Sequence, residues 1–270
     1  LPDMYRYKLD QIREVSEQCA ADAAAHKRHR GVIGLPLGLN MYENLFFWVA
    51  FFHSLDFDLV ISDISSRQLY AKGQYSVPSD TACYPAKLMH GHIENLLDKG
   101  VDTIFYPCMS YNFNEEKGDN HFNCPVVAYY PELLASNVEK LKNIRYLYPY
   151  LNLAERKTFP KKVWEALHEQ YPDITLKEVK RASDEAYEAY QAQRRDIREK
   201  GAQMLTQARA RGVKTIILSG RPYHVDPEIN HGIDTLITQF GAAVITEDSV
   251  SQLAEPFKTT VLNQWTYHAR

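Results

Sequence analysis

The sequence has few cysteines, and the ones it has are far apart. Only four occur in 270 residues: Cys19, Cys83, Cys108 and Cys124. Proteins held together by disulfides carry a denser framework of closely spaced cysteines, so this pattern argues against one. The first 13 residues are polar and charged, unlike a secretory signal peptide. We therefore expect a reducing, cytoplasmic setting in which the thiols are free for metal binding or catalysis.

Long apolar runs and a large net charge are also missing. The longest apolar candidate, residues 45–55, is too short to cross a bilayer. The formal net charge is only −3, which gives no electrostatic reason to bind nucleic acid or an anionic membrane. We therefore expect neither as a partner.

Three nucleotide and hydrolase signatures are absent as well. The sequence has no Gly-x-x-x-x-Gly-Lys-Ser/Thr loop and no Gly-x-Gly-x-x-Gly loop, so ATP or NAD binding through those loops is not expected. A Gly-x-Ser-x-Gly nucleophile elbow is missing too.

What is present is an alternation of strand and helix patterns. Short apolar runs at 31–36, 57–61 and 101–106 read as buried strands, and helical patterns at 40–55 and 84–99 lie between them. This order predicts an α/β fold with a Rossmann-like, doubly wound parallel sheet.

The composition divides the chain into four parts. We expect a lead-in helix over 1–30, a cysteine-bearing α/β domain over 31–150, a helical connector over 151–211, and the start of a second, truncated α/β domain over 212–270. Residue 1 is Leu, and residues 265–270 read as a helix without a stop signal. Both features predict that the chain is a piece of a longer protein.

Two cysteines occupy favourable positions for chemistry. Cys83 stands where the helix of 84–99 begins, and a helix N-terminus favours the thiolate form that binds metals. Cys108 follows the strand of 101–106, at the sheet edge where open α/β sheets bind ligands. The alternative is that both are small buried hydrophobic residues.

Cys124 ranks lower as a ligand. It precedes residues 125–130, which read as a further strand, and the start of a parallel strand lies at the opposite edge of the sheet. Cys19 reads as a packing residue. His90 and His92 read first as packing residues of their helix and second as ligands.

The predicted second unit has its own polar loop between a strand at 213–219 and a helix at 228–240. Arg221 could pair with a phosphate or carboxylate, and His224, Asp226 and His231 could bind a metal or move protons. The alternative is a polar loop that caps the next helix.

Together these motifs resemble the region that follows the ATPase modules in large fused activators of 2-hydroxyglutaryl-CoA dehydratase, itself similar to 2-hydroxyacyl-CoA dehydratase and benzoyl-CoA reductase subunits. The resemblance covers residues 31–270 and is carried by these segments: Leu39-Asn40-Met41-Tyr42-Glu43-Asn44, Pro78-Ser79-Asp80, Cys83-Tyr84-Pro85-Ala86-Lys87, His90-Gly91-His92, Phe105-Tyr106-Pro107-Cys108, Asn123-Cys124-Pro125 and Gly220-Arg221-Pro222-Tyr223-His224.

The resemblance implies an iron–sulfur cluster, of the 4Fe-4S kind, that receives electrons from an ATP-driven activase. In the related dehydratase subunits three cysteines hold the cluster, and Cys83 and Cys108 match the first two in setting. The third comes from a later domain, so this piece alone is expected to hold an incomplete site. The ATPase modules of the same polypeptide and an acyl-CoA substrate are the implied partners.

Three functions follow as hypotheses. The first is an iron–sulfur electron-transfer or reductive component acting in a 2-hydroxyacyl-CoA dehydratase/activase-type system. The second is a non-catalytic docking or scaffold domain that couples the ATPase modules to a partner. The third is a metal-dependent hydrolase that uses the loop at 221–231.

Overall fold

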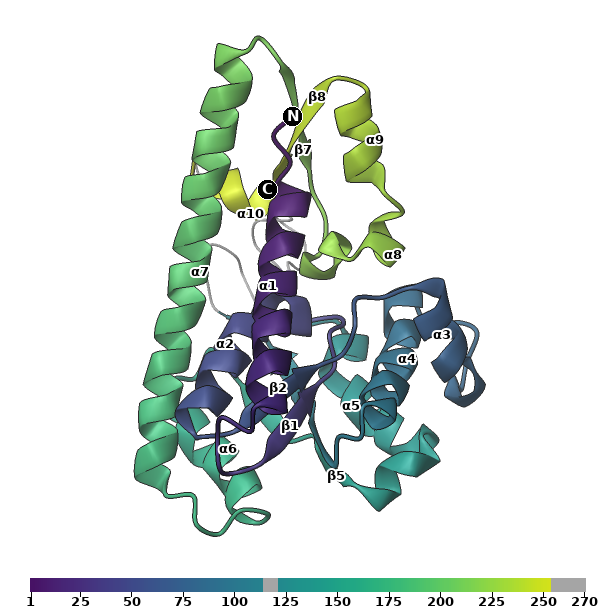
Figure 1. The fold of residues 1–270 in the computed structure, drawn as a ribbon, viewed down its shortest axis with the longest axis vertical. Coiled ribbons are helices and arrows are strands. Elements are labelled where there is room, and N and C mark those ends of the chain that lie inside the picture. Colours follow the sequence, from purple (N-terminus) through teal and green to yellow (C-terminus); the bar gives the residue numbers. More distant parts are fainter. Residues whose placement is uncertain (114–120, 254–270) are drawn as a thin grey trace.

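A computed structural model describes residues 1–113 and 121–253, and it confirms the predicted α/β class (Figure 1). The first unit contains a four-stranded parallel sheet with the order β2-β1-β3-β5. Strands β4 and β6 form a separate parallel pair, and they directly follow β3 and β5 in the chain. The strands are β1 (Val32–Leu35), β2 (Asp58–Ile61), β3 (Thr103–Phe105), β4 (Cys108–Tyr111), β5 (Arg145–Leu147) and β6 (Tyr150–Asn152). The strand order reverses between β1 and β3, which in doubly wound sheets marks the ligand-binding crevice at the carboxyl ends of the strands.

Helices cover this sheet, and its central strands β1 and β3 are therefore largely buried. The aromatic helix α2 packs on one face, where the Trp48 ring centroid lies 4.8 Å from that of Phe105. The helices and 3-10 turns of this unit are α2 (Met41–Ser54), α3 (Arg67–Gly73), η1 (Gln74–Ser76), α4 (Tyr84–Asp98), α5 (Pro125–Asn137), η2 (Glu139–Asn143) and α6 (Phe159–His168).

The second unit is smaller. Its described strands, β7 (Lys214–Leu218) and β8 (Ala242–Thr246), form a parallel pair. The remaining elements are η3 (Pro222–Val225), α8 (Pro227–Asn230), α9 (Ile233–Gln239), α10 (Glu247–Val250) and η4 (Ser251–Leu253). The single helix expected over 228–240 is wrong, because His231 and Gly232 both take left-handed backbone conformations and separate α8 from α9.

Two long helices join the units. Helix α1 (Met4–Ala24) contacts β2 in the first unit and β8 in the second, and the Val244 amide donates a 2.9 Å hydrogen bond to the Pro2 carbonyl. Helix α7 (Leu176–Ala210) begins with a capping box formed by Thr175 and Glu178. It runs along both units, as Figure 1 shows, so the predicted connector contacts both.

The strand predicted over 125–130 is wrong, because these residues form the first turns of α5. Their valines and tyrosines have strand propensity, but Pro125 stands in the first helical turn, where its missing N–H costs nothing. Val127, Tyr130 and Leu134 are buried at helical spacing. Tertiary packing therefore outweighs local propensity. The helix predicted at 265–270 lies outside the described residues.

Candidate functional site: the cysteine edge

The side chains at the end of β3 point to opposite faces of the sheet. Phe105 packs against Trp48 of α2, so Tyr106 is directed to the other face, which α4 and α5 cover. Cys108 is two residues further on, at the start of β4, a strand that packs against α5, so it lies on the Tyr106 side. The space beyond the carboxyl end of β3, between that strand and the starts of α4 and α5, is here called the cysteine edge.

Cys83 and Cys124 occupy equivalent positions at this edge. Each is the N-cap of its helix, Cys83 for α4 and Cys124 for α5, and both helices run back along the sheet from the same side. The Cys124 sulfur accepts a 3.4 Å hydrogen bond from the Val127 amide. Helix N-termini present unpaired amides and positive dipole character, so the backbone at both caps is electropositive. The reason for ranking Cys124 low was therefore incorrect, since it lies at the same edge as the other two.

Cys108 is more enclosed. It is fully buried, close to Glu132 of α5 and to Tyr150, whose hydroxyl donates its proton to the Glu132 carboxylate. Burial raises the pKa of the Cys108 thiol to about 11, although the Glu132 amide opposes this. In this arrangement the Cys108 sulfur is a protonated thiol directed at the middle of α5.

Three tyrosines surround the thiols. Burial raises the pKa of Tyr106 well above its usual value, and the nearby Cys108, Cys124 and Cys83 sulfurs add to the shift. Burial and then Cys83 raise the pKa of Tyr130 to about 12. Tyr223 of η3 is also close to Cys124 and Cys83, and burial is the largest cause of its raised pKa. The second unit therefore reaches the cysteine edge through η3.

His90 and His92 are structural. The Ser76 hydroxyl donates to the Gly73 carbonyl, so it accepts from His90 Nδ1, and His90 Nε2 accepts from the Tyr130 hydroxyl at 3.1 Å. The two nitrogens of His92 lie 2.8 and 3.0 Å from the hydroxyl oxygens of Ser62 and Ser65. Burial lowers the pKa of His90 to about 4 and that of His92 to about 3. Both rings are neutral and already have partners, which favours packing over metal ligation.

The 221–231 loop holds the two units together. Asp226 is fully buried and accepts a 2.6 Å hydrogen bond from the Tyr42 hydroxyl of α2. His224 Nδ1 accepts from the Arg221 backbone amide at 3.0 Å, with Gly220 packed against its ring. His231 caps α8 and is exposed. The structure does not bring His224, Asp226 and His231 together as a ligand set.

No group of three or more His, Cys, Asp or Glu side chains within 1–113 and 121–253 is arranged to hold a metal ion. The thiols at the cysteine edge nevertheless suit an iron–sulfur cluster in their chemistry, because cluster irons are held by thiolates. The Tyr106 hydroxyl adds a second sign of a bound group: it is buried and has no hydrogen-bond partner among the described residues. The residues present are therefore compatible with the implied cluster.

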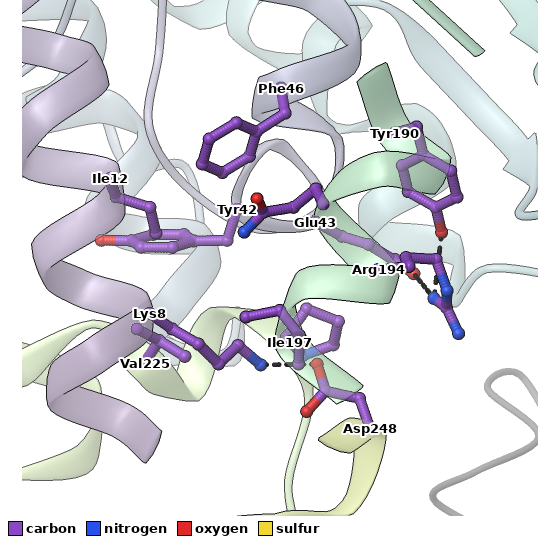
Figure 2. Close-up of a pocket in the computed structure, with 12 residues that line it drawn as sticks. Lys8, Ile12, Tyr42, Glu43, Phe46, Tyr190, Arg194, Ile197, Val225 and Asp248 are labelled. Carbon is purple, nitrogen blue, oxygen red and sulfur yellow. Dashed lines mark hydrogen bonds and ion pairs between the residues drawn. The ribbon is translucent and has the colours of Figure 1, made fainter. Parts of the chain in front are cut away.

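A small cavity with a mainly apolar lining lies between the two units, lined by residues of α1, α2, α7, η3 and α10 (Figure 2). Lys8 and Asp248 form a 2.7 Å ion pair on its wall, and Arg194 lies 4.0 Å from Glu43. The cavity measures about 60 Å³, the space of about two water molecules, so it cannot admit an acyl-CoA.

The fold and the thiols define a Rossmann-like α/β protein with a cysteine-bearing strand edge. A family model described as "CoA enzyme activase uncharacterised domain" (DUF2229) matches residues 32–250, so the chain belongs to that family. Its place is therefore in a CoA-enzyme activase-type system. No curated protein and no solved structure gives a significant match. Among the described helices, none is both long and apolar enough for a membrane span.

Sequence reasoning missed the three tyrosines of this site. Tyr106 could have been found, because it stands two residues before Cys108 and strand alternation places both on one face. Cys124 could have been placed correctly from Pro125, which marks a helix start as Pro85 does after Cys83. Tyr223 gave no such signal, since only tertiary packing brings η3 to this edge.

Proposed function

We propose that this chain is the iron–sulfur, electron-transfer or reductive component of an ATP-dependent 2-hydroxyacyl-CoA dehydratase/activase-type system. In this proposal Cys83, Cys124 and Cys108 supply thiolates to a cubane cluster. The bound cluster would take up and release single electrons at low potential. ATPase modules of the same polypeptide would deliver these electrons, and an acyl-CoA would be the final acceptor.

One observation carries the proposal: in a protein of the CoA enzyme activase family, Cys83 and Cys124 cap helices α4 and α5, and Cys108 begins β4 directly after β3. Two of the three cap helices that contact each other, and the free backbone amides of a helix N-terminus attract anionic groups. A chance scatter of packing cysteines would not be expected to place two N-caps side by side.

Cluster binding requires a change at Cys108. Its side chain is now buried beside Glu132 and Tyr150, and burial raises its pKa to about 11. The Cys108 side chain would have to turn from α5 toward the helix starts and lose its proton. Iron would drive that step, since a metal-bound thiol is deprotonated.

Anaerobic reconstitution with iron and sulfide tests the proposal. We expect iron and sulfide to be retained after desalting, with broad charge-transfer absorbance and an EPR signal on reduction. Cys83→Ala, Cys108→Ala and Cys124→Ala should each lower the retained iron. Cys19→Ala is the matched control, because Cys19 is buried in α1 and caps no helix. Iron uptake that survives all three substitutions would contradict the proposal.

Docking of the ATPase modules is a second candidate, favoured by an exposed apolar surface on the second unit. Ile216 and Ile217 of β7 and Leu236 of α9 are exposed, and Phe240, which follows α9, is 82% exposed. In the described part of the chain β7 pairs with β8 alone, which leaves an edge for another strand. Ile217→Lys with Phe240→Glu should weaken co-purification with the ATPase modules while leaving iron uptake intact. Unchanged co-purification would remove this candidate.

The metal-dependent hydrolase gains no support. Its three residues are separated, and the Asp226 carboxylate is occupied by the Tyr42 hydroxyl and the Glu228 amide. Zinc retained after purification and lost in His224→Ala would be needed to revive it.

A further inference from the structure

The Tyr106 hydroxyl has no hydrogen-bond partner among the described residues, unlike the hydroxyls of Tyr130, Tyr146 and Tyr187. Tyr106 is fully buried, and among the described residues no group accepts a hydrogen bond from its hydroxyl or donates one to it. By contrast, the Tyr130 hydroxyl bonds to His90, the Tyr146 hydroxyl to the Pro131 carbonyl, and the Tyr187 hydroxyl to the Leu153 carbonyl. A buried hydroxyl without a partner costs stability, so such a group calls for an explanation.

The position of Tyr106 in the fold explains why its hydroxyl has no partner. Strand alternation directs its ring away from α2, toward the face that α4 and α5 cover. Cys108 stands two residues after Tyr106, and Cys83 and Cys124 are the N-caps of the two helices on that face. The one unpartnered tyrosine hydroxyl of this face therefore stands among the three proposed ligands.

We propose that the Tyr106 hydroxyl donates a hydrogen bond to a sulfur of the group that Cys83, Cys108 and Cys124 bind. This inference rests on the proposed function, since it names a positioning and tuning residue for the same site. Tyr106 would not ligate iron. It would orient the cluster and withdraw electron density from one sulfur.

Two physical consequences separate this role from simple packing. A hydrogen bond to a cluster sulfur stabilises the reduced, more negative state, so it raises the reduction potential. In the metal-free protein the same hydroxyl is an unsatisfied polar group, so it lowers stability. Removing the hydroxyl should therefore help the metal-free protein and harm the loaded one.

Tyr106→Phe removes only the hydroxyl and keeps the ring. In the metal-free protein we expect its melting temperature to rise by a few degrees. Tyr187→Phe is the matched control, because its buried hydroxyl has a 2.8 Å partner, and its melting temperature should fall. If Tyr106→Phe lowers the melting temperature as the control does, the hydroxyl already has a partner in the protein and the inference is overturned.

The loaded protein gives the second measurement. We expect Tyr106→Phe to take up iron, to show a midpoint potential shifted to more negative values, and to lose iron to a chelator several-fold faster than wild type. Tyr187→Phe should change neither the potential nor the rate of iron loss. An unchanged potential and rate in Tyr106→Phe would overturn this inference and leave the proposed function standing. A wild-type protein that takes up no iron would overturn both.

Discussion

The hydroxyl of Tyr42, in the second helix of the chain, donates a 2.6 Å hydrogen bond to the carboxylate of Asp226, which lies 184 residues later. Both residues are buried, and Asp226 belongs to the loop that follows β7. The Glu228 amide also donates a 2.9 Å hydrogen bond to this carboxylate. The loop expected to carry metal or proton chemistry therefore fastens the second unit onto the first.

Tyr42→Phe tests how much this contact stabilises the protein. The substitution removes one donor from a buried carboxylate, so we expect the free energy of unfolding to fall by about 1.5–3 kcal/mol. Urea unfolding at pH 7 measures the change. Tyr75→Phe serves as the control: its hydroxyl also bonds to a carboxylate, that of Glu94, but Tyr75 is 65% exposed. A loss no larger than in the control would mean that Asp226 does not depend on Tyr42.

The two buried histidines of α4 predict a loss of stability in mild acid. In the folded protein the pKa of His90 is lowered to about 4 and that of His92 to about 3, both by burial, from 6.5. Between pH 6.5 and about 4 the unfolded chain therefore binds protons that the folded protein does not. Their stabilising contribution is complete above pH 6.5 and falls by ~1.4 kcal/mol per pH unit for each ring as the pH drops.

Urea unfolding at pH 7, 6 and 5 measures this dependence. The comparison of His92→Gln with wild type isolates one ring, because the remaining titrating groups are common to both. We expect the slope of unfolding free energy against pH to be shallower in His92→Gln by ~1.4 kcal/mol per pH unit. Identical slopes would show that His92 is not held neutral in the folded protein.

Gly91 predicts a packing requirement between α3 and α4. A Cβ on Gly91 would lie 2.1 Å from the Leu69 carbonyl oxygen, and one on Gly73 would lie 2.2 Å from the Gly91 amide. Because backbone must move to admit that methyl group, we expect Gly91→Ala to lower the free energy of unfolding by about 1–3 kcal/mol or more. Calorimetry or urea unfolding measures the loss.

Gly100→Ala is the control for that substitution. Gly100 follows α4 with φ +75° and has nothing within 4 Å of an added Cβ, so only backbone strain of about 1 kcal/mol should appear. Equal losses in the two variants would mean that close helix packing at Gly91 is not the cause.

Thiol labelling should rank the four cysteines by exposure. Cys83 is exposed and Cys124 half-buried, whereas Cys19 and Cys108 are buried. Burial also raises the pKa of Cys19 to about 12 and of Cys108 to about 11, so neither is a thiolate near neutrality. We expect iodoacetamide at pH 8 to modify Cys83 first, Cys124 more slowly, and the other two on unfolding, as measured by peptide mass spectrometry. Early labelling of Cys108 in native protein would contradict its buried setting.

Much of the first unit could be predicted from local pattern. The buried strand after Gly31 and the helix between Pro85 and Gly100 are set by apolar periodicity, a first-turn proline and a terminal glycine, all of which act over a few residues. The same local rules misread residues 125–130, where valine and tyrosine propensity pointed to a strand. Packing of Val127, Tyr130 and Leu134 against the first unit decided for a helix.

The sequence by itself determined which residue types stand at element boundaries: Cys83 before a helix, Cys108 after a strand, and Gly220 before a polar turn. The tertiary structure alone decided which of these meet. It placed Cys124 at the start of α5, on the same side of the sheet as Cys83 and Cys108. It buried Cys108 beside α5, and it paired the Asp226 carboxylate with the Tyr42 hydroxyl. The physical reason is range: capping and strand alternation act between near neighbours in the chain, whereas burial and hydrogen bonding across 184 residues depend on how the whole fold closes.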